Sequence, residues 1–311
     1  MILTLTPNAA LDRLLFIEEF QPGAVMRPRK MLDRVGGKGL DSSVALRGLG
    51  VETTALTFVG GQTGQTLMSL LEAYGIRHDL IWLDGETRIA HVLIESRRQR
   101  HSHIITQTLA VTPEAATEFL QRYQAHLGEA AWVIAAGSLP PGVPGSYYRT
   151  ISQMAHEAGV PILVDGTGPP VTAMLPVPPT ILKMNWDEFC QTFGARAGTL
   201  DQLKKQAQAI YERERLFALV LTCGEQGILA VTPEGTYQAR SPVQPVVNAA
   251  GAGDAASAAL AWRFSTGANW PETLRWAAAV SAAVVLTEGT ADCRMTDIQR
   301  ILPQIKIENL A

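Results

Sequence analysis

The sequence places a carboxylate directly after a glycine-rich turn, in the run Gly251-Ala252-Gly253-Asp254. An alanine-rich stretch follows, so this run is expected to open a helix. Glycines let a ligand approach the backbone closely, and the N–H groups at a helix start attract anions. Asp254 could therefore accept a proton from a substrate hydroxyl while residues 251–253 bind a developing phosphoryl charge. The alternative is a tight turn in which Asp254 only caps the helix.

A second glycine turn follows a short apolar strand predicted at 218–222. Thr222 ends that strand, and Gly224 and Gly227 form a G-x-x-G turn after it. Such a turn suits the phosphates or ribose of a nucleotide, although most turns of this type only connect two elements. The chain has no G-x-x-x-x-G-K-[ST] pattern and no G-x-G-x-x-G after its first strand. The second absence argues against an oxidoreductase that uses NAD or FAD.

Polar residues also follow a strand predicted at 180–182. Lys183 could reach a phosphate group, and Asn185 and Glu188 could organise a hydrated Mg²⁺ ion, which prefers oxygen ligands. A solvated helix start would have the same composition. The pattern is therefore compatible with a nucleotide site without requiring one.

Two further motifs could bind the phosphoryl acceptor. Gly37, Lys38 and Asp41 open a helix predicted at 40–49, where Lys38 could neutralise an anion and Asp41 could accept hydrogen bonds from hydroxyls. Ser138 lies in a proline-rich loop after a buried strand. Ligands of open α/β sheets collect at the carboxyl ends of strands, so this loop is a candidate contact. Glycine-rich turns without a ligand remain the alternative.

These motifs lie in a regular alternation of short apolar strands and amphipathic helices. Strands are predicted at 2–6, 54–59, 132–135, 161–165 and 218–222, and helices at 40–49, 63–73, 146–158, 200–214 and 252–266. The alternation predicts a mostly parallel sheet covered on both faces. Segments 14–34 and 88–107 lack helical periodicity and are either an extra small sheet that acts as a lid or two surface hairpins.

The overall composition excludes several partners. The 311 residues carry a formal net charge of -3, which gives no reason to expect nucleic acid binding. No apolar run reaches membrane-spanning length, and the N-terminus lacks the pattern of a signal peptide. The three cysteines, Cys190, Cys223 and Cys293, are far apart and odd in number. These features predict a cytoplasmic protein without disulfides or a zinc site.

Read in order, the motifs resemble those of the ribokinase-like (PfkB-type) carbohydrate kinases, in particular the branch of 1-phosphofructokinase and tagatose-6-phosphate kinase. The resemblance runs from residues 6–12 to Asp254 and so spans nearly the whole chain. It implies a single α/β domain over residues 1–311, built as a Rossmann-like three-layer α/β/α sandwich with a small β-sheet lid. It also implies a homodimer formed through the lid.

The resemblance implies a division of labour with ATP and Mg²⁺ as cofactors. Asp254 would be the catalytic base, and residues 251–253 would form the anion hole. The residues implied to contact ATP are Thr222, Gly224, Gly227, Lys183 and Asn185, with Glu188 acting on Mg²⁺ through water. The residues implied to bind the sugar or sugar phosphate are Asp12, Gly37, Lys38, Asp41, Arg88, Ser138 and Asp254.

The sequence departs from this branch on the acceptor side. Asp41 stands where the branch usually has Asn, and Val92 stands where it has the lysine expected to hold the substrate's phosphate. Either other basic residues of the lid replace that lysine, or the acceptor carries no phosphate. The candidate replacements are Arg97, Arg98, Arg100, His101 and His103.

The sequence thus favours a hexose-phosphate kinase and leaves two alternatives open. One is a kinase of an unphosphorylated sugar or nucleoside on the same fold, which the changes at Asp41 and Val92 favour. The other is a non-catalytic sensor of sugar or nucleotide on a kinase scaffold, because a fold does not fix a function. Retention of Asp254 between its glycine turn and its helix argues against the sensor.

Overall fold

The computed structural model describes residues 1–98 and 100–310, so position 99 of the predicted lid segment lies outside the described residues. Within this part, ten strands form a large sheet and four form a small one. The strands of the large sheet, in spatial order, are β14 (Lys306–Asn309), β13 (Gly235–Arg240), β12 (Ile228–Thr232), β11 (Leu219–Thr222), β10 (Ile181–Asn185), β9 (Ile162–Asp165), β8 (Trp132–Ala136), β1 (Ile2–Thr6), β4 (Thr53–Gly60) and β5 (Arg77–Leu83).

The large sheet is parallel from β11 to β5 and antiparallel from β11 to β14. Its first strand lies in the interior, between β8 and β4. The chain therefore leaves β1 on one side and later returns on the other, which creates a switch point at the carboxyl end of β1. The predicted α/β fold with a mostly parallel sheet is confirmed.

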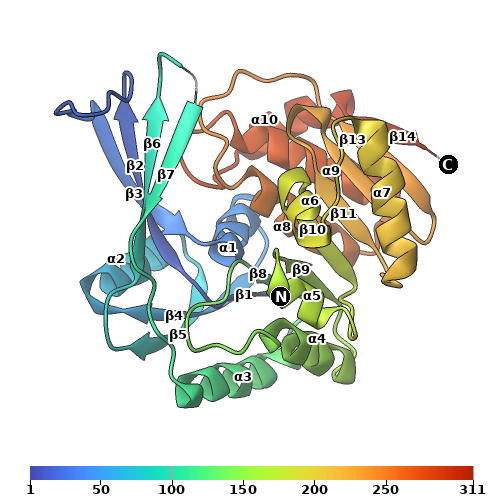
Figure 1. Cartoon of the computed structure of the whole chain (residues 1–311), viewed down its shortest axis with the longest axis horizontal. Coiled ribbons are helices and arrows are strands. Elements are labelled where there is room, and N and C mark those ends of the chain that lie inside the picture. The colour runs from blue at the N-terminus through green and yellow to red at the C-terminus, as the bar shows by residue number, and fades with distance from the viewer. Residues whose placement is uncertain (99, 311) are drawn as a thin grey trace.

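Helices cover both faces of this sheet, as Figure 1 shows. One face packs against α3 (Pro113–Leu127), α4 (Tyr147–Glu157), α5 (Pro169–Met174), α6 (Trp186–Phe193) and α7 (Leu200–Arg213). The other packs against α1 (Lys38–Gly48), α2 (Gly61–Ala73), α8 (Ala252–Ser265), α9 (Trp270–Val284) and α10 (Met295–Ile301). Successive side chains of a strand enter opposite layers, since Ile2 lies in the second core and Leu3 in the first.

The alanine-rich helices α8 and α9 pack side by side in the second layer. Small side chains let two helices lie close together, and most alanines of both helices are buried. The alanine-rich apolar stretch 276–286 lies largely within α9. Among the described residues, no helix has the length and apolar character needed to cross a membrane.

The small sheet stands away from the large one in Figure 1 and consists, in order, of β3 (Lys30–Gly36), β2 (Ala10–Ile17), β6 (Arg88–Glu95) and β7 (Arg100–Ile105). The two segments that break the alternation thus form one sheet rather than two separate hairpins. The first segment of the small sheet, residues 10–36, is longer than the predicted 14–34. It starts earlier because β2 begins at Ala10, three residues after Pro7. Cross-strand pairing sets Asp12 opposite both Arg34 and Ala90, and Arg88 opposite Ala10. Asp12, Arg34 and Arg88 therefore share one face of this small sheet, which is the predicted lid.

Candidate active site

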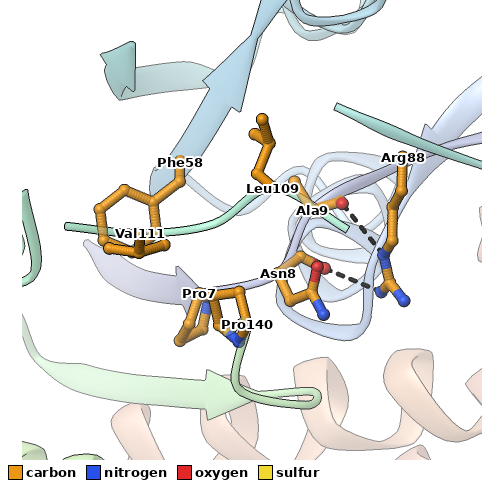
Figure 2. Close-up of a pocket in the computed structure, with 8 residues that line it drawn as sticks. All are labelled: Pro7, Asn8, Ala9, Phe58, Arg88, Leu109, Val111 and Pro140. Carbon is orange, nitrogen blue, oxygen red and sulfur yellow. Dashed lines mark hydrogen bonds between the residues drawn. The ribbon is translucent and has the colours of Figure 1, made fainter. Parts of the chain in front are cut away.

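The loops that follow β1 and β8 meet because these strands are parallel neighbours. The Asn8 amide donates a hydrogen bond to the Ser138 hydroxyl at 2.9 Å. The Arg88 guanidinium donates to the backbone carbonyl oxygens of Asn8 and Ala9, at 2.9 and 3.2 Å. Figure 2 shows the two hydrogen bonds of Arg88, beside residues that line a small pocket of about 10 Å³. Ser138 and Arg88, both predicted to bind substrate, thus lie at the switch point of the sheet.

Asp165 lies at the carboxyl end of β9 and holds two lysines. Its Oδ2 lies 2.7 Å from Nζ of Lys183, and its Oδ1 lies 2.9 Å from Nζ of Lys38. The Ser257 hydroxyl donates to Oδ2 at 3.1 Å. Burial alone would raise the pKa of Asp165, but the charges of Lys183 and Lys38 outweigh it and lower the pKa to about 2. The sequence analysis missed this residue, although an acid that ends a buried strand was a usable signal.

The Lys38 ammonium also pairs with Glu188, at 2.7 Å from Oε1. Glu188 in turn forms a capping box with Asn185 at the start of α6: the Asn185 side chain accepts from the Glu188 N–H, and Glu188 Oε2 accepts from the Asn185 N–H. The ammonium group of Lys38 thus contacts both Asp165 and Glu188, and it shares Asp165 with Lys183. The expected role of Lys38 in the sugar pocket stays a prediction. Lys183 itself belongs to β10 rather than following it.

The start of α8 explains why its two glycines are needed. Gly251 has a φ of +79°, and a Cβ there would lie 2.4 Å from the backbone nitrogen of Ala291. A Cβ on Gly253 would lie 2.9 Å from Nζ of Lys183. Helix geometry leaves the first N–H groups of α8 without partners inside the helix. The turn therefore presents N–H groups next to a lysine, which suits an anion.

Asp254 is buried in the first turn of α8. Burial, followed by the negative charge of Asp165, raises its pKa to about 7, while Lys183 and Lys38 act in the opposite direction. A carboxylate with a pKa near neutrality can both hold and release a proton. The geometry therefore allows Asp254 to act as a general base next to an anion site.

Asp12 and Asp41 form the acidic part of the site, facing Arg88. Thr290 donates a hydrogen bond to Oδ2 of Asp12 at 3.2 Å. Burial raises the pKa of Asp12 to about 7, against the effects of Thr290 and Arg88. Asp41, in the first turn of α1 behind Gly37, is 5% exposed. Carboxylates and an arginine in this arrangement can bind hydroxyls and a phosphate at the same time.

The predicted ATP turn adjoins the start of α8. A Cβ on Gly253 would lie 4.0 Å from the hydroxyl oxygen of Thr222, so β11 ends beside the anion site. Gly227 has a φ of +86°, and a Cβ there would lie 2.0 Å from the carbonyl oxygen of Ala239. Packing against β13 by itself thus requires glycine at 227. Gly224 has a φ of +56° and open space around it, which leaves room for a ligand.

The carboxylates beside the anion site are already paired within the protein, which fits contact with Mg²⁺ through water. Within residues 1–98 and 100–310, no group of three or more His, Cys, Asp or Glu side chains could hold a metal ion. Both carboxylate oxygens of Glu188 are occupied, by Lys38 and by the Asn185 N–H. Both oxygens of Asp165 contact lysines. The role of Glu188 toward Mg²⁺ through water therefore stays a prediction.

Known proteins share this fold along its whole length. The chain is 30% identical over 299 residues to the ATP-dependent 6-phosphofructokinase isozyme 2 of Mycobacterium tuberculosis, covering 96% of this chain and 88% of that protein. A possible 1-phosphofructokinase from Thermotoga maritima superposes with a TM-score of 0.91, at 28% identity and full coverage of both chains. Phosphofructokinase-2 from Escherichia coli, in complex with potassium, superposes with a TM-score of 0.87 at 25% identity, covering 97% and 98% of the two chains.

The fold, the lid sheet and the buried acid at a glycine turn together define a kinase that acts on small molecules. The chain matches the pfkB family carbohydrate kinase over residues 8–297, and it belongs to that family.

Proposed function

We propose that the protein transfers the γ-phosphoryl group of ATP to a hydroxyl of a hexose phosphate, with Asp254 as the general base. The observation that carries the proposal is the position of Asp254. Its carboxyl group is buried at the start of α8, has a pKa raised to about 7 by burial, and lies in the field of Lys183 and Lys38. A buried acid of this kind suits proton transfer to and from a hydroxyl at neutral pH.

In the proposed reaction, the acceptor oxygen forms a bond to the γ-phosphorus while the bond from that phosphorus to the bridging oxygen of ADP breaks. Asp254 takes the hydroxyl proton, and ADP leaves with the bonding electrons. Phosphoryl transfer depends mainly on positioning and on stabilising charge. Lys183 and the N–H groups of Gly253 and its neighbours supply that stabilisation, and the lid sheet limits the access of water.

The names of the relatives support a phosphorylated acceptor, since all three are phosphofructokinases by name, one of them as a possible 1-phosphofructokinase. The structure indicates which lid residues could hold its phosphate. Arg97 and Arg98 pair with Glu19, and Arg100 pairs with the buried Glu95. Val92 is fully buried. Of the basic residues on the face shared with Asp12, Lys30 pairs with Glu288, whereas Arg34, Arg88, His101 and His103 are better placed.

A kinase of an unphosphorylated sugar or nucleoside is the second candidate. The negative charge of Asp12 is among the causes that raise the pKa of Asp41, so the two carboxyl groups lie near each other. Two carboxyl groups suit an acceptor rich in hydroxyls, because each can accept hydrogen bonds. They suit a phosphate group less well, because their negative charges would repel it.

The test is ADP release from Mg·ATP with fructose 1-phosphate, fructose 6-phosphate, tagatose 6-phosphate, free hexoses, ribose and nucleosides as acceptors. Stimulation by one of the hexose phosphates alone supports the proposal. Stimulation only by an uncharged acceptor selects the second candidate. Binding of ATP or sugar without ADP release from any acceptor would instead indicate a sensor without catalytic activity.

We further propose that residues 1–311 act as a single domain and that two copies pair through their lid sheets. Met31 and Ile104 are 56% and 57% exposed. Strand alternation places both on the lid face opposite to that of Asp12. Exposed apolar residues on neighbouring strands suit the core of a protein interface.

A further inference from the structure

Asp41 has a hydrogen-bonding capacity that the protein leaves unused. Its side chain lies in the first turn of α1 and is buried, with 5% of the residue exposed. Its Oδ1 atom has no hydrogen-bond partner anywhere in the described part of the chain. Buried polar atoms are nearly always paired in folded proteins, and an unpaired one calls for an explanation. A ligand atom that completes the pair is such an explanation.

The charged groups that influence Asp41 come from β2, β6, α8 and the segment after α9, and most are negative. Asp12 of β2, Asp254 of α8 and Asp292 after α9 all disfavour a negative charge on Asp41. Arg88 of β6 is the cation among the groups that influence it. Behind Asp292 lie Tyr74, whose hydroxyl donates to that carboxylate, and Arg34, 3.9 Å from it. Within this group, the acids therefore outnumber the two arginines, Arg88 and Arg34.

This setting favours the un-ionised carboxyl group. Burial is the largest cause that raises the pKa of Asp41 well above its ordinary value, and the charges of Asp12 and Asp254 act in the same direction. The helix start favours the anion, but this effect is smaller than the cost of burying an unpaired charge. A carboxyl group that keeps its proton can donate a hydrogen bond, which a carboxylate cannot.

We propose that Asp41 binds the phosphoryl acceptor in its un-ionised form and donates a hydrogen bond to an acceptor oxygen. This inference rests on the proposed function, because it assumes that the acceptor binds between α1 and the lid. It assigns Asp41 a role in substrate binding and specificity that a charged aspartate could not fill. A negatively charged acceptor is then compatible with the acidic pocket, because Asp41 adds no charge to it.

The proposal predicts that the protein binds the acceptor more weakly as the pH rises. As the pH rises through the pKa of Asp41, the donor is lost and a negative charge appears beside the acceptor. Acceptor binding then weakens, by about tenfold for each pH unit if only the protonated form binds. The second ionisation of a sugar phosphate lies near pH 6, so it is complete through most of the range above neutrality.

Two measurements on the full-length protein test the proposal separately. The first is a ¹³C NMR titration of aspartate-labelled wild type and Asp41→Asn, in which the missing signal identifies the Asp41 carboxyl carbon. The proposal expects that signal to stay at the protonated position at neutral pH. An ionised Asp41 at pH 7 would overturn the proposal even if the protein proves to be an active kinase.

The second measurement is the acceptor KM between about pH 7 and pH 9, with the acceptor that the ADP-release panel identifies. We expect the wild-type KM to rise with pH and the Asp41→Asn KM to stay constant because the amide keeps a donor. The Asp12→Asn KM should also rise, but from a lower pH, because loss of the Asp12 charge lowers the pKa of Asp41. An Asp41→Asn variant whose KM rises as steeply as that of the wild type would overturn the role. Absence of turnover with every acceptor would contradict the proposed function, and the NMR titration would still decide the protonation of Asp41.

Discussion

Nζ of Lys183 lies 2.7 Å from Oδ2 of Asp165, and both side chains are almost completely buried. The two residues are direct cross-strand partners on β10 and β9. A buried charge is tolerated when a partner of opposite sign compensates it. Asp165 thus fixes Lys183 beneath the start of α8 and holds Lys38 at the same time. It acts on the anion site through these lysines.

Replacing Asp165 is expected to destabilise the folded protein. Asp165→Asn should lower the free energy of unfolding by about 3–5 kcal/mol, because it leaves a buried ammonium group uncompensated. Urea denaturation measures the change. Glu308→Gln is the matched control, since it breaks the exposed cross-strand pair with Arg240 and should cost at most about 1 kcal/mol. Equal losses in the two variants would show that Asp165 does not compensate a buried charge.

We expect Asp254, the proposed general base, to determine how kcat/KM depends on pH. Below about pH 7 the raised pKa of Asp254 leaves it protonated, so kcat/KM should fall about tenfold per pH unit. Asp254→Asn should lower kcat by about 10²–10⁴ and leave ATP binding intact. Steady-state kinetics and calorimetric titration with ATP check both expectations. Undiminished turnover in Asp254→Asn would exclude its role as the base.

The carboxyl group of Asp254 should make the wild-type protein less stable as the pH rises. Because burial raises the pKa of Asp254 from 3.8 to about 7, the unfolded chain ionises first and is favoured as the pH rises through this window. Asp254→Asn removes the effect. Its Tm relative to the wild type should therefore increase between about pH 4 and pH 7 and then level off. A difference in Tm that stays constant with pH, measured by differential scanning calorimetry, would contradict the raised pKa.

Glycine at position 253 is expected to be needed for catalysis. A methyl group there would lie 2.9 Å from Nζ of Lys183, which Asp165 holds in place. Gly253→Ala should lower kcat by at least about tenfold, a part of the 10²–10³ that loss of an anion-hole donor costs. Gly128→Ala is the control, because nothing lies within 4 Å of its added Cβ. Full activity of Gly253→Ala would show that the backbone at 253 does not approach the transferred group.

The lid surface should control assembly. Met31→Glu and Ile104→Glu place charges at two exposed apolar positions of the lid, so we expect each variant to be monomeric where the wild type is a dimer. Light scattering coupled to size-exclusion chromatography measures the mass. Phe217→Glu, at a 54% exposed position outside the lid, is the control and should keep the dimer. A wild type that is monomeric at every concentration would reject the proposed pairing.

The sequence by itself determined the local elements and the position of the motifs. The strand predicted at 2–6 has the bounds of β1, and the helices predicted at 146–158, 200–214 and 252–266 agree with α4, α7 and α8 to within a residue at each end. Periodicity and glycine turns are local signals, since they reflect which faces of a short segment are buried. The glycine-rich run that ends at Asp254 is a local signal of the same kind.

Only the tertiary structure decided which side chains meet. The sequence analysis did not anticipate β12, β13 and β14 or helix α3, nor the contact between Lys38 and Asp165. Lys38 meets Asp165, which lies 127 positions away, because α1 begins at the same sheet edge at which β9 ends. Strand order is set by long-range packing that a local pattern does not encode. The unpaired oxygen of Asp41 arises in the same way, since burial by distant segments decides whether an aspartate keeps its proton.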